Sequence, residues 1–334
     1  SSLSFEMLIH EFEKFVNNEE KIREKIEENY ESVMASSKNN IKYIKDIVDE
    51  VNKKEKNYKL LNYTKPEKYA GSYLRCRYGY ATDSTIRENV ASGGMITALL
   101  CYLLRRGIID GAWVTKTEIS DKGELEYRTF IATTEEEIRS ASSSVYMDIP
   151  LIKHIGMAKD FQGKLAVVMT PCMLHVLTNL MEKDPDLKEK IIFKFGLYCS
   201  GNHAKKATEV ALKKAGISMK NAHRLYYRRG HWRGQSSMIY CDGSEKIFSY
   251  AKTICAYKNA YFYEKQSCML CQDHYARYSD ISFGDVWLGR MKKSPIKYTS
   301  CIIRTPEILK LYSEAVNEGV LKDYHLSGSD LVKS

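Results

Sequence analysis

Two segments decide the fold class of this sequence: Lys164-Leu-Ala-Val-Val-Met-Thr-Pro-Cys172 and Ile191-Ile-Phe-Lys-Phe-Gly-Leu-Tyr-Cys199. Each opens with a short apolar run, which is typical of a buried strand. The residues between them, from His175 to Glu182, carry the spacing of a helix. A strand, a helix and a second strand in this order predict an α/β architecture.

The same alternation continues on both sides of these segments. Gly107 is placed to end a helix, and the sequence predicts further strands at 111–114, 237–241 and 298–304, with helices at 205–215 and 306–317. We therefore expect a mixed α/β fold with a helical N-terminal extension. The predicted divisions are an extension at 1–65, an N-terminal domain at 66–150 and a C-terminal domain at 151–334.

The first 65 residues differ from the rest, because they contain no glycine and no proline. Acidic and basic residues nearly balance there, so the basic excess lies in the remainder of the chain. Apolar residues recur at helical spacing: Phe5, Leu8, Ile9, Phe12, Val16, Ile22, Ile26, Tyr30, Val33, Ile41, Ile44, Ile47 and Val51. This pattern fits either an extension packed on the body of the protein or an arm that docks a partner subunit or a second copy.

Composition excludes several classes of protein. With 44% hydrophobic residues in 334, the chain can bury a sizeable core and is not intrinsically disordered. No window approaches the roughly 18 uncharged apolar residues of a membrane span, and the start lacks the pattern of a signal peptide. We expect a cytoplasmic protein whose net charge of +9 suits anionic partners. Nine cysteines are too few for a disulfide scaffold in a chain of this length, and their number is odd. Both observations favour unpaired thiols.

Four of the cysteines share a structural context that suggests one centre. Cys172 and Cys199 follow the two buried strands, and the carboxyl ends of such strands are where α/β folds bind ligands. Cys268-Met-Leu-Cys271 adds a C-x-x-C pair in a segment with turn character. Four thiolates suit a structural zinc ion or an iron–sulfur cluster, while a C-x-x-C pair alone also fits an unliganded or redox-active dithiol.

A glycine pair marks a second candidate site, in Ala91-Ser-Gly-Gly-Met-Ile-Thr97. Ser92 is a good helix N-cap, and Gly93 and Gly94 would let the backbone approach a ligand closely. The free N–H groups of the helix that follows suit a phosphate or the polar edge of a flavin. A tight turn with no ligand explains the pattern equally well.

A third candidate site is the stretch from Tyr226 to Gly234, where cations and aromatic rings alternate. Arg228, Arg229, Trp232 and Arg233 could hold a planar anionic ligand. Such residues also stack on RNA bases, so a zinc-stabilised RNA-binding module is a rival interpretation, although nucleic acid is the less favoured partner. A hairpin with a solvated basic face is the simplest alternative.

Together these segments resemble the coenzyme F420 hydrogenase/dehydrogenase beta-subunit family, which includes 7-hydroxymethyl chlorophyll a reductases. The resemblance runs from about Gly71 through the last predicted helix. Its markers, beyond the cysteines and the two stretches above, are Gly107-Ile-Ile-Asp-Gly111, Gly196-Leu-Tyr-Cys199 and Ser279-Asp-Ile-Ser-Phe-Gly-Asp-Val-Trp287. Departures are the helical extension, the lack of a ferredoxin-like run of cysteines, and Gly-His-Trp-Arg-Gly where a lysine-glycine-tryptophan-proline arrangement is expected.

The resemblance implies an iron–sulfur flavoprotein oxidoreductase with FAD and one [4Fe-4S] cluster. It implies hydride transfer from reduced coenzyme F420 to FAD, then single electrons through the cluster to a redox partner protein; ferredoxin or another donor is the alternative. Such chemistry needs no general acid–base pair from the protein. The residues it implies are, for the cluster, Cys172, Cys199, Cys268 and Cys271; for the flavin, Ser92, Gly93, Gly94, Thr97, Ser143, Ser144 and Tyr146; and for the donor, Arg228, Arg229, Trp232 and Arg233.

Overall fold

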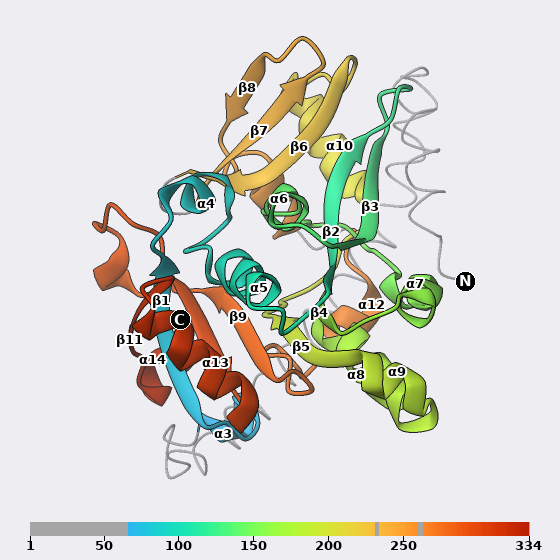
Figure 1. The fold of residues 1–334 in the computed structure, drawn as a ribbon. Coiled ribbons are helices and arrows are strands. Elements are labelled where there is room, and N and C mark those ends of the chain that lie inside the picture. Colours follow the sequence, from blue (N-terminus) through green and yellow to red (C-terminus); the bar gives the residue numbers. More distant parts are fainter. Residues whose placement is uncertain (1–65, 231–233, 260–262, 334) are drawn as a thin grey trace, which may run out of the picture. The chain divides into compact units, whose positions relative to one another are not determined.

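The structure is a computed structural model, and it describes residues 66–230, 234–259 and 263–333 (Figure 1). The described residues belong to one compact unit. The predicted N-terminal helices lie outside the described residues. So do Trp232 and Arg233.

A mixed eight-stranded sheet is the centre of the fold, in the order β11-β1-β10-β9-β5-β4-β2-β3. Its four middle strands, β9, β5, β4 and β2, are parallel, and the strands on either side are antiparallel. The bounds are β1 Arg75–Ala81, β2 Gly111–Ile119, β3 Leu125–Ala132, β4 Leu165–Met169, β5 Ile191–Leu197, β9 Ile281–Asp285, β10 Thr299–Ile303 and β11 Leu321–His325. The predicted α/β fold is confirmed, with antiparallel strands at both edges of the sheet.

A smaller antiparallel sheet has the order β6-β7-β8, with β6 Ala222–Arg229, β7 Gln235–Tyr240 and β8 Glu245–Phe248. The hairpin of β2 and β3 extends to lie beside β6 (Figure 1), and the Thr117 hydroxyl on β2 donates to the Leu225 carbonyl on β6. The last residues of β6 therefore lie near loops that leave the large sheet.

Helices cover the faces of the large sheet. Those before β4 are α3 Glu67–Ala70, α4 Ser84–Asn89, α5 Met95–Arg105, α6 Glu135–Ser140, the 3₁₀ helix Leu151–His154 and α7 Ile155–Asp160. Those between β4 and β9 are α8 Pro171–Lys183, α9 Pro185–Lys190, α10 Lys205–Lys214, α11 Ile254–Lys258 and α12 Gln266–Met269. The 3₁₀ helix Gly289–Met291, α13 Pro306–Asn317 and α14 Gly328–Lys333 follow.

Alternating side chains along the strands supply two separate cores. On β2, Ala112 and Val114 pack in the core that contains α5 and α13, whereas Trp113 packs in the core that contains α8 and α9. The same alternation on β4 places Ala166 in the first core and Val167 in the second. Because strand side chains alternate between faces, short apolar runs suffice to bury both faces of the middle strands.

The predicted strands and helices are confirmed as β2, β4, β5, β7, β10, α10 and α13, and the predicted helix at 175–182 begins earlier, at Pro171. The strands β1, β3, β8, β9 and β11 were not predicted. Strands from 66–150 and from 151–334 share the large sheet, and the predicted boundary between those segments stays a prediction. Among the described residues, no helix is long and apolar enough to cross a membrane.

Candidate functional site: a cavity beside four cysteines

A cavity of about 700 Å³ opens at the carboxyl ends of the parallel strands, a size typical of small-molecule sites. The ends of β4, β5 and β9 contribute Thr170, Cys199 and Asp285 to its lining. Carboxyl ends of neighbouring parallel strands meet at one edge of a sheet, which is where open α/β sheets bind ligands. Most of the predicted flavin residues line it: Ser92, Gly94, Thr97, Ser143, Ser144 and Tyr146.

One wall of the cavity is the loop that joins α4 to α5. Thr299, at the start of β10, bonds to this loop through its Oγ1, which accepts from the Gly93 N–H at 2.8 Å and lies 2.8 Å from Ser92 Oγ. The Lys297 ammonium donates to the Val90 carbonyl, and the Ala81 N–H donates to the Gly93 carbonyl at 2.8 Å. The loop is thus fixed by backbone and side chains from β1 and β10.

The glycines of this loop are required by the protein itself. A Cβ on Gly93 would lie 2.5 Å from the Gly79 carbonyl oxygen, and a Cβ on Gly94 would lie 2.9 Å from Ile86 Cγ2. Gly94 also has a φ of 82°, in the left-handed region that favours glycine. The two glycines therefore pack closely against β1 and α4, and their contact with a ligand stays a prediction.

Gly94 is the N-cap of α5, so the prediction that Ser92 caps this helix is wrong. Ser92 instead bonds to Thr299. Within the described residues, no side chain caps the N-terminus of α5, and Gly94, Met95 and Thr97 of its first turn line the cavity. The unbonded N–H groups of this turn and the helix dipole favour an anionic or polar group there.

The opposite wall runs from Ser142 to Tyr146 and contains strained backbone. Ser143 has a φ of 92°, which a residue with a side chain rarely adopts, and its hydroxyl donates to the Arg228 carbonyl at 2.8 Å. Arg224 donates to the carbonyls of Ser140 and Ser142. Such strain persists only where its surroundings enforce it, and here β6 supplies those bonds.

Arg228 lies between the two walls and is buried, with 3% of the residue exposed. Its guanidinium donates to both carboxylate oxygens of Asp285, at 2.6 and 3.0 Å, to the Ala91 carbonyl at 3.0 Å and to the Tyr146 hydroxyl at 3.1 Å. These bonds use both terminal nitrogens. Protein atoms thus already occupy these donors, and contact of Arg228 with a bound anion stays a prediction.

The neighbouring Arg229 is not among the residues that line the cavity. It donates to the Asn89 side-chain oxygen at 3.1 Å and pairs with Glu245, while its guanidinium lies over the Tyr226 ring. The basic stretch that begins at Tyr226 is therefore the end of a hairpin whose first two arginines contact protein. Contact of Arg229, Trp232 or Arg233 with a donor stays a prediction.

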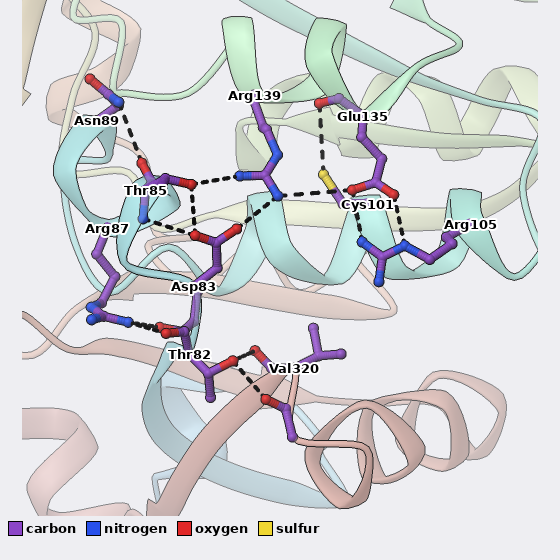
Figure 2. A network of polar contacts seen from close by, with 12 residues as sticks. Thr82, Asp83, Thr85, Arg87, Asn89, Cys101, Arg105, Glu135, Arg139 and Val320 are labelled. Atoms are coloured by element: carbon purple, nitrogen blue, oxygen red, sulfur yellow. Dashed lines mark hydrogen bonds and ion pairs between the residues drawn. The ribbon is translucent and has the colours of Figure 1, made fainter.

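A polar network joins the helices from which the two walls start (Figure 2). Arg139 on α6 donates to Asp83 at 2.8 Å and to Thr85 Oγ1 at 3.1 Å, both at the start of α4. Glu135 on α6 pairs with Arg105 on α5 at 2.8 Å. Burial opposes ionisation of Asp83, yet its bonds to Thr85 and Arg139 outweigh burial and lower its pKa to about 2. The network ties α4, α5 and α6 together behind the cavity.

The four predicted cysteine ligands come from three elements. Cys172 is exposed in the first turn of α8, and Cys199 follows β5. Cys268 lies in the one-turn helix α12, and the Cys271 N–H donates to its carbonyl at 3.1 Å, so the predicted turn of the C-x-x-C segment is a helical turn. All nine cysteines are unpaired, as predicted.

Backbone bonds bring the C-x-x-C segment to the end of β5. The Lys265 N–H donates to the Asn202 carbonyl at 3.1 Å, and the Ala204 N–H to the Tyr263 carbonyl at 2.9 Å. His203 and Glu264 form a bridge between these two segments. Cys268 thus lies close to the loop that begins at Cys199.

The thiols influence one another electrostatically. Burial, with contributions from the neighbouring Cys172 and Cys268, raises the pKa of Cys199 to about 11. Burial likewise raises the pKa of Cys268, with contributions from Cys172 and Cys271. Within the described part of the chain, however, no three or more His, Cys, Asp or Glu side chains are placed so that they could hold a metal ion.

Sequence reasoning missed several residues that shape the cavity: Tyr250, Lys258, Lys297 and Thr299. Thr299 begins a strand that was predicted. The residues around it in the sequence, however, give no sign that its hydroxyl accepts a hydrogen bond from Gly93. Asp285 and Trp287 belong to a motif that was recognised in the sequence. Only the fold shows that Asp285 pairs with Arg228 and that the Arg228 guanidinium lies over the Trp287 ring. The lysines carry no local pattern that separates them from the many others.

Sequence profiles of a known family cover most of the unit that contains this cavity. The profile described as "Coenzyme F420 hydrogenase/dehydrogenase, beta subunit N-term" matches residues 76–156, and the profile for the C terminus of the same subunit matches residues 162–326. The chain belongs to this family. It is an oxidoreductase, because the family's named members are subunits of hydrogenases, dehydrogenases and reductases.

Individual relatives agree with the profiles. The coenzyme F420 hydrogenase subunit beta of Methanosarcina barkeri is 25% identical over 267 residues, which are 76% of this family member and 82% of the relative. The F420-dependent formate dehydrogenase 1 subunit beta of Methanococcus maripaludis is 25% identical, over 73% of this chain and 60% of the relative. A chain in the structure of the F420-reducing [NiFe] hydrogenase complex from M. barkeri superposes with a TM-score of 0.59 at 25% identity, covering 77% of this chain and 84% of that one.

Proposed function

We propose that this chain is a flavin- and iron–sulfur-containing subunit that takes a hydride from reduced coenzyme F420 and passes single electrons to a partner subunit. The observation that carries the proposal is the position of Cys199, which lines the cavity and also belongs to the group of four thiols. A centre held by these thiols would lie at the wall of a cavity that fits a flavin. Relatives named as beta subunits of hydrogenase and formate dehydrogenase support a partner subunit and the donor F420.

The residues present fit both groups by their chemistry. Four thiols are the donor set of a [4Fe-4S] cluster or a zinc site, and here Cys268 interacts with Cys172, Cys199 and Cys271. Cys172 also lies at a helix N-terminus, which favours negative charge. The uncapped first turn of α5 and the Ser142–Tyr146 wall offer donors for the phosphates and ring edge of a flavin. The four side chains would need to turn toward a common centre, because they are not yet arranged around one.

A bound flavin would supply the exchange between a two-electron hydride and single electrons. The protein's own residues would hold and orient it. Thr299 and Lys297 fix one wall, and Arg228 links that wall to Tyr146 on the other. The apolar part of the lining would keep water from the reacting ring. No general acid or base is required of this chain.

The test is anaerobic purification followed by iron, zinc and flavin analysis of matched cysteine variants. The parent should contain about four iron atoms and one FAD per chain. Cys268→Ala should lose most of the iron or convert the cluster, because a thiolate ligand is removed. Cys241→Ala, an exposed cysteine in a turn away from the site, should keep its iron.

Stoichiometric zinc without iron in the parent would contradict the cluster and favour a structural metal site. Equal iron in the parent and in Cys268→Ala would show that these thiols are not its ligands. FAD that stays bound in Cys268→Ala is expected, since the cavity walls come from other residues.

A further inference from the structure

Lys258 is the last residue of α11 and reaches both parts of the candidate site. Its ammonium donates to Ser200 Oγ at 3.2 Å, and Ser200 directly follows Cys199. The same ammonium lies 5.5 Å from the centre of the Tyr146 ring, in the wall predicted to contact flavin. Lys258, Ser200 and Tyr146 all line the cavity. One cation thus stands where the cavity meets the cysteines.

The charge of Lys258 has no partner in the cavity lining; outside the lining it acts on Glu264, where it opposes the burial that raises the pKa of that carboxyl. The other lysine, arginine, aspartate or glutamate residues of the lining are Arg228 and Asp285, and these two pair with each other at 2.6 Å. In the segments that the structure describes, no carboxylate lies within ion-pair distance of Lys258, whereas Lys265 pairs with Asp148. The lining therefore carries one excess positive charge, contributed by Lys258.

The field of Lys258 reaches the candidate cluster ligands. Its hydrogen-bond partner Ser200 directly follows Cys199, and burial together with the charge of Lys258 lowers the pKa of His203 to about 4. A cation stabilises added negative charge more strongly in a partly buried site than in water, because the effective dielectric constant is lower. Reduction of a flavin or of a cluster adds such charge.

We infer that Lys258 sets the reduction potentials of both centres by stabilising their reduced forms. This inference rests on the proposed function. Lys258 acts through its charge on whatever occupies the cavity and the thiol group. Because Lys258 lies between the two centres, it raises both reduction potentials together. The difference between the two potentials therefore stays small.

The test compares Lys258→Met with Lys252→Met by anaerobic redox titration of the purified protein. Lys252 is exposed on the loop before α11 and is not part of the lining, so its substitution makes the same change of net charge outside the site. In Lys258→Met we expect the ratio of reduced to oxidised cluster at a fixed potential to fall about tenfold, which is about 59 mV for a one-electron couple. The flavin potential should fall as well. Lys258→Arg should keep both potentials near the parent values.

If Lys258→Met binds flavin weakly, the dissociation constants of oxidised and reduced flavin give the same information through a thermodynamic cycle. Weakening confined mainly to the reduced form supports the inference. Equal weakening of both forms, or unchanged potentials with iron and FAD both present, overturns it. A parent protein without iron and flavin overturns the proposed function first, and is detected before any variant is made.

Discussion

At the scale of single residues, the site depends on buried charges that are paired. Arg228 and Asp285 hold each other through two hydrogen bonds, while Arg228 also bonds to both cavity walls. Removing one partner of a buried pair leaves the other charge uncompensated, which costs far more than breaking an exposed pair. Arg228 thus holds the two walls of the cavity together through its hydrogen bonds.

Arg228→Gln should lower the free energy of unfolding by about 3–5 kcal/mol, the range for breaking a buried ion pair. Arg290→Gln breaks the more exposed pair with Asp330 and should cost much less, because solvent screens that pair. Urea denaturation of both variants measures the difference. Equal losses in the free energy of unfolding for the two variants, together with a raised KM for the donor in Arg228→Gln, would indicate that Arg228 binds the donor.

Lys297 provides a test by pH. Burial and the nearby Arg228 lower its pKa to about 7, against the attraction of Asp285. The unfolded chain, with a lysine pKa near 10.4, binds more protons than the folded protein between about pH 7 and 10, so stability rises with pH across this window. The rise should reach up to about 1.4 kcal/mol per pH unit and be absent in Lys297→Met.

Urea denaturation between pH 7 and 9.5 measures this slope. Lys293→Met, which changes an exposed lysine nearby, should keep the slope of the parent. A parent and a Lys297→Met variant with parallel pH profiles would show that Lys297 is charged in the folded protein.

At the scale of elements, the loop before α5 shows what a sequence can and cannot predict. The strands β4 and β5 and the helix α13 were predictable, because their apolar spacing is local. The need for glycine at position 93 was not predictable, because the atom that excludes a side chain there is the carbonyl oxygen of Gly79 on β1. The strands β1 and β11 were missed because tyrosines and charged residues interrupt their pattern. The positions of Cys172 and Cys199 after β4 and β5 were predictable, because strand ends carry a positional signal.

Gly93→Ala should destabilise the protein even without any cofactor, because its Cβ would lie 2.5 Å from the Gly79 oxygen and 2.8 Å from the Thr299 nitrogen. Overpacking of this kind costs about 1–3 kcal/mol or more. Gly289→Ala is the matched control, since a Cβ there meets no atom within 4 Å. The measurement is urea denaturation of flavin-free protein. Full stability of Gly93→Ala, with loss of flavin alone, would return this glycine to the role of a ligand contact.

At the scale of the whole molecule, the fold places a cavity and a set of thiols at the carboxyl ends of the parallel strands, and the proposed function joins them by electron transfer. The cavity lining and Cys199 meet at the end of β5. An electron that enters at the cavity would therefore leave through the exposed side, where Cys172 and Cys271 reach the surface. A partner subunit would dock there to receive it.

The most direct test of the proposed function is an anaerobic single-turnover reaction between reduced coenzyme F420 and the purified, oxidised protein, without any acceptor. We predict that oxidised F420 forms as the flavin absorbance falls, with about one F420 consumed per flavin, and that the cluster signal is then reduced. In Cys268→Ala the flavin should still bleach while the cluster signal is missing. Reduced F420 that leaves the flavin of the parent protein oxidised would contradict the proposed function.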